Sequence, residues 1–196
     1  QWTMLNTVRD DHDRVRHFIS VFSDISEMKA QEATIQHKTY YDPLTDLPNR
    51  PLFYDRLKME IQPEFASDRR QAVLYLDLDR FKFINDSLGY LIGDKVLKEV
   101  ASRLMDTIRG VDSLARMGND EFAILMTDIK NPEEVMALYQ SILQAFVRPV
   151  LVEDHEFHLK FSIGVSFYPE DGHNEILLMK NAEMAMNNAK EQGGQK

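Results

Sequence analysis

The sequence contains no cysteine among its 196 residues. Disulfide bonds, thiolate nucleophiles and cysteine-ligated zinc sites are therefore excluded together. Apolar runs are short, and none approaches the roughly 18 residues of a membrane-spanning helix, nor does the start resemble a signal peptide. Because the first residue is Gln1 rather than methionine, we expect the chain to be part of a longer protein, with any membrane anchor lying upstream.

Basic residues are fewer than acidic ones: the chain has 23 Lys and Arg and 32 Asp and Glu, which gives a formal net charge of −9. A surface that follows a nucleic-acid backbone needs a stripe of basic side chains, so we expect no nucleic-acid polymer as a partner. A single nucleotide remains open, because bound magnesium can supply positive charge locally. The length suits one ordinary domain with a short appendage, and the composition is typical of an acidic, soluble, cytoplasmic protein.

The first 41 residues have a different pattern from the rest. Two segments rich in β-branched and aromatic residues, the second spanning Val15 to Phe22, lie on either side of an acidic turn and predict a β-hairpin. Because an isolated hairpin is marginally stable in water, we interpret residues 1–25 as the last strands of a truncated domain. Residues 26–41 predict a helix with a sparse apolar stripe, suited to a signalling linker or coiled coil; a solvated connector helix is the alternative.

From residue 42 onward, short apolar runs alternate with segments whose apolar residues recur every three or four positions. The expected helices begin at residues 50, 81 and 132, the last with Pro132 at its first position, and span 93–108 and 175–190; the expected strands span 72–78, 113–117, 121–126, 147–152 and 157–167. This order predicts an α+β domain over residues 42–196, in which helices flank a central mixed, mostly antiparallel sheet.

Two acidic residues end a buried strand of this domain, in the run Leu76-Asp77-Leu78-Asp79. Alternate residues of a strand share a face, so Asp77 and Asp79 are expected to point the same way. Burying an unpaired carboxylate is costly, and Mg²⁺ prefers oxygen ligands, so Asp77 is a candidate metal ligand. The alternative for Asp79 is that it caps the helix that begins at Phe81.

A second acidic pair follows the tip of the predicted hairpin, in the run Gly118-Asn119-Asp120-Glu121. Glycine tolerates positive φ best and asparagine next best, which accounts for the first two residues of the tip. Two consecutive acids are not needed for turning, although a plain turn with a solvated Glu121 is the alternative. If the two strand ends meet, Asp77, Asp120 and Glu121 together form a plausible metal and phosphate site.

Several ordered motifs over about residues 40–195 resemble the GGDEF domain of diguanylate cyclases. They are Asp42 to Arg50, Asp77 to Asp86, Gly89 to Asp94, Arg116 to Phe122, Ser162 to Ser166 and Pro169 to Gly172. Residues 1–24 look like the end of a PAS sensor domain, a weaker match, and the following helix would be the linker that joins sensor to output.

The resemblance implies a reaction in which two GTP molecules condense to cyclic di-GMP and release two pyrophosphates. Each 3′-hydroxyl attacks the α-phosphate of the other GTP, so two copies of the domain must face one another as a homodimer. Phosphoryl transfer depends on positioning and charge neutralisation, which Mg²⁺ or Mn²⁺ held by Asp77, Asp120 and the Leu78 carbonyl would supply. Glu121 would assist a second metal ion or accept the 3′-hydroxyl proton.

The family's substrate-binding positions also have counterparts here. Lys82 and Lys190 match the phosphate-contacting positions, with Lys82 also counted among the catalytic residues. Asn85 and Asp94 match the guanine-reading positions, because a carboxylate accepts hydrogen bonds from guanine N1 and N2. The remaining substrate-binding positions are Phe81, Gly118 and Asn119. The alternatives are a solvated surface lysine for Lys82 and helix capping for Asn85 and Asp94.

Arg109 and Asp112 have the Arg-x-x-Asp form at the family's distance from the signature. They resemble the inhibitory site, where bound cyclic di-GMP restrains the domains, and an arginine fork with a carboxylate suits a guanine face and edge. An ordinary surface ion pair is the alternative.

The sequence departs from the family at four positions: Asn119 replaces the second glycine of the signature, Tyr90 a usual histidine, Asn187 a usual tyrosine and Gly194 an arginine that often contacts phosphate. We therefore carry two hypotheses, an active cyclase with PAS input, or a catalytically weak module that binds GTP or cyclic di-GMP, possibly ahead of an EAL phosphodiesterase domain. A purely structural interaction domain is hard to reconcile with the retained acids.

Overall fold

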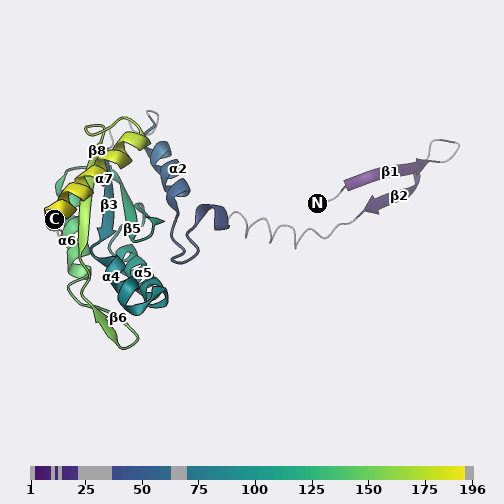
Figure 1. The fold of residues 1–196 in the computed structure, drawn as a ribbon. Helices are drawn as coiled ribbons and strands as arrows, with labels where there is room; N and C mark the ends of the chain where they lie inside the picture. The colour runs from purple at the N-terminus through teal and green to yellow at the C-terminus, as the bar shows by residue number, and fades with distance from the viewer. Residues whose placement is uncertain (1–2, 10–11, 13–14, 22–36, 63–69, 193–196) are drawn as a thin grey trace. The chain divides into compact units, whose positions relative to one another are not determined.

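The computed structural model describes residues 3–9, 12, 15–21, 37–62 and 70–192. The chain divides into two compact units, Gln1–Thr39 and Tyr40–Lys196 (Figure 1). In the first unit, β1 (Thr3–Arg9) pairs antiparallel with β2 (Val15–Val21), which confirms the predicted hairpin. Most of the linker helix predicted over residues 26–41 lies outside the described residues. Residues 37–40, which belong to its described part, are helical.

The second unit contains a four-stranded sheet in the order β4-β5-β3-β8. Its strands are β3 (Arg70–Leu78), β4 (Ser113–Gly118), β5 (Glu121–Ile129) and β8 (Phe161–Tyr168). All three pairings in this sheet are antiparallel, and within the described chain parallel pairing occurs in the isolated bridge between Asn49 and Arg116. The predicted α+β class and sheet are confirmed.

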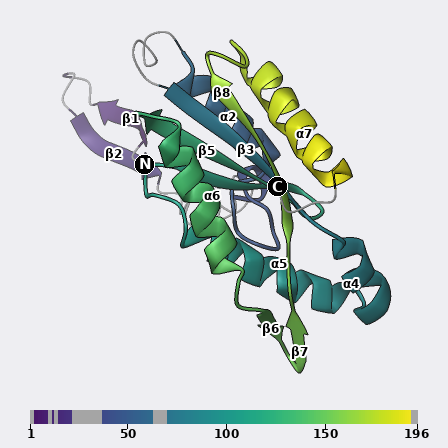
Figure 2. The same cartoon turned by 90° about the vertical axis from the view of Figure 1, so that its left-hand side faces the viewer.

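Residues on alternate sides of β3 belong to two different apolar clusters. Leu74, Leu76 and Leu78 pack in one cluster with α5 (Tyr90–Met105) and α6 (Glu133–Ala145). Val73 and Tyr75 pack in the other with α2 (Arg50–Glu60) and α7 (Glu175–Glu191). The sheet therefore lies between two helical layers (Figure 2), and the odd-numbered side of β3, which includes Asp77, faces α7.

Helix starts follow the capping chemistry of the sequence. The side chain of Asn49 accepts a hydrogen bond from the Leu52 amide at the start of α2, and Asn174 accepts one from the Leu177 amide at the start of α7. The predicted helices at these places are confirmed. Pro132 is the residue before α6 rather than its first helical residue, a shift of one position.

Two boundaries differ more. The helix expected over 93–108 begins at Tyr90, so that Gly93 lies inside α5, where an added Cβ would stand 2.0 Å from the Asn85 Oδ1 atom. The strands expected over 147–152 and 157–167 are instead a small hairpin, β6 (Val150–Val152) and β7 (His155–Phe157), followed by β8. Pro149 has no amide hydrogen to donate, which fits the later start of β6.

A short helix, α4 (Phe81–Leu88), connects the end of β3 to α5. Both views show α4 and the β6–β7 hairpin at the same end of the sheet (Figures 1 and 2). None of the helices in the described part of the chain is long and apolar enough to cross a membrane.

Candidate functional site

The acids predicted from the sequence lie at one end of the sheet. Asp77 at the end of β3 is the register partner of Glu121, the first residue of β5. The hairpin tip between β4 and β5 has positive φ at Gly118 (135°) and Asn119 (44°), which glycine and asparagine tolerate. The Asp120 carbonyl accepts a hydrogen bond from the Leu78 amide (3.3 Å), so the tip is fastened to the end of β3. We call Asp77, Asp120 and Glu121 the acidic cluster.

Charge in the acidic cluster is only partly compensated. Burial and the nearby charge of Asp77 raise the pKa of Asp120. Burial also raises the pKa of Glu121, although its Oε2 atom accepts a hydrogen bond from the Tyr75 hydroxyl (3.1 Å), which acts in the opposite direction. Carboxylates whose ionised form is disfavoured in this way favour the arrival of a cation.

Lys190 supplies one positive charge to the cluster. Its Nζ atom lies 2.6 Å from Asp77 Oδ1, and the Asp77 side chain is only 8% exposed while that of Lys190 is 44% exposed. Burial lowers the pKa of Lys190, but the hydrogen bond and charge of Asp77 outweigh it and raise the pKa overall. The pair follows from the fold, because Asp77 is on the side of β3 that faces α7.

The same residues fit a divalent cation in part. Asp77, Asp120 and the Leu78 carbonyl are hard oxygen donors of the kind that Mg²⁺ and Mn²⁺ take, and burial, with the charge of Asp77, raises the pKa of Asp120. Within the described residues, however, no three His, Asp or Glu side chains are grouped as a ready metal site. The Glu121 side chain is instead directed to Tyr75. Two carboxylates and one carbonyl are therefore the set that would hold a metal ion.

The positions matched to substrate binding lie on α4 and α5. Asn85 lies in the interior of α4 with its side chain against Gly93 of α5, and Asp94 follows Gly93 inside that helix. Because neither residue is at a helix end, the capping alternative for both is wrong. Lys82 is exposed, as a residue that contacts a soluble ligand would be. Phe81 is 5% exposed and packs in the core, so only its backbone is available to a ligand.

Asp79 does not cap α4. Its Oδ1 atom accepts a hydrogen bond from Ser162 Oγ (2.7 Å), and its amide donates to the Lys160 carbonyl (2.9 Å). The residue before α4 is Arg80, which has a left-handed backbone with φ 62° and no capping side-chain bond. The capping alternative for Asp79 is therefore wrong, and Asp79 instead joins the end of β3 to β8.

One interaction near the signature has no counterpart in the sequence analysis. Arg116 donates through NH1 to Asp42 Oδ1 (2.9 Å), and through Nε and NH2 to the Asn119 carbonyl (3.1 and 2.6 Å). The Thr45 amide and hydroxyl also donate to Asp42 Oδ1, and hydrogen bonds from Thr45 and Arg116 lower the pKa of Asp42 despite its burial. This Asp42–Arg116 bridge fixes the hairpin tip; both residues belong to the motifs quoted above, but their pairing across the chain is not readable from spacing.

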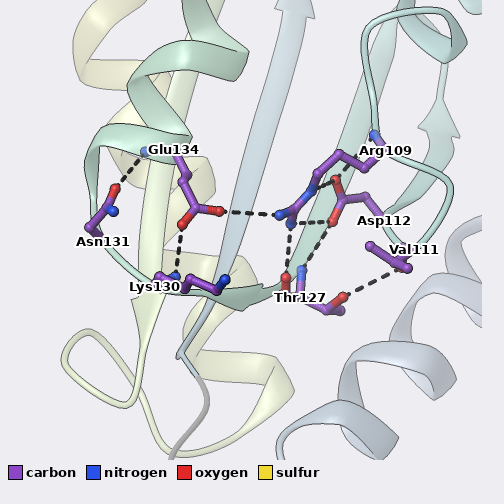
Figure 3. A network of polar contacts seen from close by, with 7 residues as sticks. All are labelled: Arg109, Val111, Asp112, Thr127, Lys130, Asn131 and Glu134. Atoms are coloured by element: carbon purple, nitrogen blue, oxygen red, sulfur yellow. Dashed lines mark hydrogen bonds and ion pairs between the residues drawn. The ribbon is translucent and has the colours of Figure 1, made fainter.

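Arg109 and Asp112 lie elsewhere, in a self-contained polar network (Figure 3). Arg109 donates to both oxygens of Asp112 (Nε and NH2, each 2.8 Å), to the Thr127 carbonyl (2.8 Å) and to Glu134 (3.2 Å). Asp112 also accepts from the Arg109 and Thr127 amides (3.3 and 3.2 Å), and its side chain is 1% exposed. We call these four residues the Arg109 network. Its accessible groups are Arg109 and Glu134, because Asp112 is enclosed.

Comparison with known proteins shows which family has this sequence and fold. Residues 39–196 match the family described as diguanylate cyclase, GGDEF domain. The chain is 42% identical over 153 residues to the bifunctional diguanylate cyclase/cyclic di-GMP phosphodiesterase MucR of Pseudomonas aeruginosa, a match that covers 78% of this chain and 22% of MucR. It is 34% identical over 168 residues to the diguanylate cyclase TpbB of the same species, covering 85% of this chain and 39% of TpbB. The chain thus spans only a part of these relatives.

Solved structures agree with the sequence matches. The GGDEF domain of TpbB superposes with a TM-score of 0.76 at 35% identity, covering 79% of this chain and 91% of that one. A sensory box/GGDEF family protein of Caulobacter crescentus superposes with a TM-score of 0.74 at 37% identity, covering 79% of this chain and 99% of that one. With a matching family, similar sequences and a shared fold, residues 39–196 belong to the GGDEF-domain family of diguanylate cyclases.

Proposed function

We propose that this domain is a diguanylate cyclase that condenses two GTP molecules into cyclic di-GMP. The observation that carries the proposal is the acidic cluster: a strand end and the signature hairpin tip hold incompletely neutralised carboxylates together, with Lys190 beside them. Such a site suits a ligand that brings metal ions and phosphate groups with it.

The residues have distinct roles in the proposed reaction. A divalent ion bound by Asp77, Asp120 and the Leu78 carbonyl would neutralise phosphate charge. Asn85 and Asp94 would orient guanine from α4 and α5, while Lys82 and Lys190 would contact the phosphates. In each transfer the 3′-oxygen of one GTP forms a bond to the α-phosphorus of the other, the α–β bridging bond breaks, and pyrophosphate leaves.

Glu121 is the proposed acceptor of the 3′-hydroxyl proton. Its carboxylate is the one member of the acidic cluster that is oriented by a neutral donor, the Tyr75 hydroxyl, and burial raises its pKa, which makes it a better base than a solvated glutamate. One domain holds one GTP, and each GTP supplies one attacking hydroxyl. Two copies must therefore meet, and we propose a homodimer as the active form.

A direct assay tests the proposal. The dimeric protein, incubated with GTP and Mg²⁺ or Mn²⁺, is expected to produce cyclic di-GMP and pyrophosphate in a 1:2 ratio, measured by chromatography and a coupled pyrophosphate assay. Omission of the divalent ion should abolish both products. A demonstrated dimer that binds GTP with metal but forms no cyclic di-GMP would overturn the cyclase assignment.

The Arg109 network supports a proposed product-binding role. Arg109 is 43% exposed at its side chain, and an exposed guanidinium held in place by a buried carboxylate suits a guanine face. We expect Arg109→Ala, assayed at low temperature where it is folded, to keep its initial turnover rate and to weaken inhibition by added cyclic di-GMP about tenfold. Inhibition curves that coincide for the two proteins would remove this role.

A second function is favoured by Asn119, which places a side chain at a tip where the family has glycine. In this alternative the domain binds GTP or cyclic di-GMP with weak turnover and regulates a neighbouring domain; the similarity to bifunctional MucR makes a downstream phosphodiesterase of the EAL type the neighbour to test. If calorimetry detects no binding of GTP and no binding of cyclic di-GMP to this chain, this second function is excluded.

The surroundings of the domain are also proposals. An N-terminal hairpin ahead of a linker, together with the similarity to a sensory box/GGDEF protein, supports input from a PAS sensor ending near residue 25. Because GTP is the substrate, we propose that the domain works in the cytoplasm.

A further inference from the structure

Tyr75 is a buried tyrosine of β3 whose hydroxyl reaches the acidic cluster. Its side chain lies on the face of the sheet that α2 and α7 cover. Its register partners on this face are small, Ala123 of β5 and Gly164 of β8. Diagonal neighbours across an antiparallel pair are within reach of an aromatic side chain. The hydroxyl therefore extends past Ala123 to Glu121, where it donates to the Oε2 atom (3.1 Å).

Glu121 lies between two alternative partners. It is the register partner of Asp77, and directly opposed residues of an antiparallel pair have Cβ atoms only about 4.5–5.5 Å apart. Its carboxylate is thus within reach of a cation held at Asp77. In the observed conformation it is directed instead to Tyr75, and no other side chain in the described part of the chain donates a hydrogen bond to it. The direction of the Glu121 side chain therefore depends on one hydroxyl group.

Charge alone would turn Glu121 toward a bound cation. Its charged neighbours come from three elements and are all acidic, namely Asp77 of β3, Asp120 of the hairpin tip and Glu183 of α7. Burial raises the pKa of Glu121, and the charges of these three side chains raise it further. A carboxylate in such surroundings gains from contact with a positive ion. The hydrogen bond from Tyr75, whose ring is held in the apolar cluster, opposes that movement.

We propose that Tyr75 is a positioning residue that keeps Glu121 out of the coordination shell of the metal ion and so assigns it to proton transfer. This inference rests on the proposed function for its metal ion and its 3′-hydroxyl. With Oε2 engaged by Tyr75, Oε1 is the oxygen that takes the proton while the 3′-oxygen bonds to phosphorus, the α–β bridging bond breaks and pyrophosphate leaves. Asp77, Asp120 and the Leu78 carbonyl remain the set that would hold the ion.

Mn²⁺ binding to the nucleotide-free 196-residue chain tests the positioning directly, with free Mn²⁺ measured by electron paramagnetic resonance. Tyr75→Phe keeps the buried ring and removes the hydroxyl, so Glu121 is released to the ion and Mn²⁺ affinity is expected to rise about tenfold. Glu121→Gln alone should change the affinity less than about threefold, whereas added to Tyr75→Phe it should remove the whole gain.

Three results of the Mn²⁺ measurement would overturn the inference. The first is an unchanged or lower affinity in Tyr75→Phe, and the second is the absence of measurable Mn²⁺ binding in both proteins. The third is a tenfold weaker affinity in Glu121→Gln alone, because this would identify Glu121 as a metal ligand in the natural protein. The third comparison does not require that Tyr75→Phe folds.

Turnover gives a second measurement. Tyr75→Phe at saturating Mn²⁺ is expected to lower kcat for cyclic di-GMP formation at least about tenfold. The KM for GTP should stay within about twofold, because the substitution removes no contact with substrate. A raised KM with unchanged kcat would instead place Tyr75 in substrate binding and contradict its positioning role.

Tyr168→Phe is the matched control. Tyr168 packs against the same apolar cluster as Tyr75 but pairs with Gln71, at the end of the sheet away from Asp77. This control is expected to keep Mn²⁺ affinity and kcat within about twofold. Equal effects of the two tyrosine substitutions would show a general packing effect and remove the positioning role.

The outcomes also separate the two proposals. If Tyr75→Phe raises Mn²⁺ affinity through Glu121 but the natural protein forms no cyclic di-GMP, the proposed function fails and the control of Glu121 by Tyr75 stands. If the natural protein forms cyclic di-GMP while its Mn²⁺ affinity equals that of Tyr75→Phe, the function stands and the inference fails.

Discussion

The acidic cluster and the Arg109 network both contain buried carboxylates, but they treat the charge in opposite ways. Asp112 accepts four hydrogen bonds and is enclosed by its partner arginine and Thr127 (Figure 3). Asp120 lies near a second carboxylate, which together with burial raises its pKa. The Arg109 network is complete without a ligand, whereas the acidic cluster needs an additional cation.

This difference separates a carboxylate that stabilises the fold, Asp112, from a carboxylate that needs a cation, Asp120; the product-binding role proposed for the Arg109 network belongs to its exposed guanidinium. A carboxylate whose hydrogen bonds are all made within the protein stabilises the folded state, and its loss is costly. A carboxylate whose charge is disfavoured in the folded state reduces stability and is retained for chemistry. The two regions should therefore respond in opposite ways to removal of one negative charge.

The largest expected effect is on turnover. Asp120→Asn removes a proposed metal ligand and is expected to reduce cyclic di-GMP formation by about a thousandfold or more. Without metal at pH 7 its Tm should rise, because the raised pKa of Asp120 means that the charged form disfavours folding. Thermal denaturation measures the Tm, and product chromatography measures the rate of cyclic di-GMP formation. The control is Asp55→Asn, at an exposed position of α2. A lower Tm would contradict the contrast.

Asp112→Asn tests the other side of the comparison. It replaces an enclosed carboxylate by an amide that cannot accept all four hydrogen bonds, so we expect a loss of about 2–3 kcal/mol in the free energy of unfolding. Urea denaturation measures the loss. The initial turnover rate at low temperature should change less than about threefold, since the Arg109 network lies away from the acidic cluster; a large loss of turnover in folded protein would break the comparison.

The Asp42–Arg116 bridge is an intermediate case, because it is satisfied internally and yet holds the signature tip. Asp42→Asn is expected to cost about 1–2 kcal/mol at pH 6. The hydrogen bonds lower the pKa of Asp42 below its ordinary value of 3.8, so its contribution is fully present above that value and is lost as pH falls through the folded pKa. Urea denaturation from pH 6 to pH 2.5 should show the difference between variant and natural protein shrinking; a difference independent of pH would assign the effect to packing.

Asn119→Gly is expected to have the smallest effect. Asparagine tolerates the positive φ of the tip, and Arg116 binds the Asn119 carbonyl, which the substitution retains. We expect a change in unfolding free energy below about 0.5 kcal/mol and a change in turnover below about threefold. A tenfold rise in turnover would instead show that the natural side chain restrains the reaction and would favour the binding-module hypothesis.

The fold was largely predictable because its signals are local. Asn49 and Asn174 are N-caps directly before α2 and α7, and Gly118-Asn119 is a turn sequence at the junction of β4 and β5. Boundaries decided by tertiary contact were missed. The sequence pattern predicts a helix start at Gly93, whereas Gly93 is an interior residue of α5 whose missing Cβ makes room for Asn85.

The sequence predicts which residues form the candidate site, but it does not predict which side chains they contact. The motifs contain Asp77, Asp120 and Glu121, but the pairs that orient them join distant parts of the chain: Lys190 with Asp77, Tyr75 with Glu121 and Arg116 with Asp42. The alternation of side chains along β3 shows which residues share a face with Asp77. It does not show that α7 covers that face. No spacing rule gives that information.

The central position of β3 has a consequence for how the protein comes to be. Leu74 pairs with Ile124 of β5 on one side and with Val165 of β8 on the other, so the middle strand is completed by segments far apart in the chain. Such non-local pairing slows folding, and during synthesis from the N-terminus β8 is the last of the four strands to leave the ribosome. A nascent chain therefore cannot bring Asp77 to Lys190 before nearly the whole domain has emerged, so the acidic cluster is among the last parts of the domain to be completed.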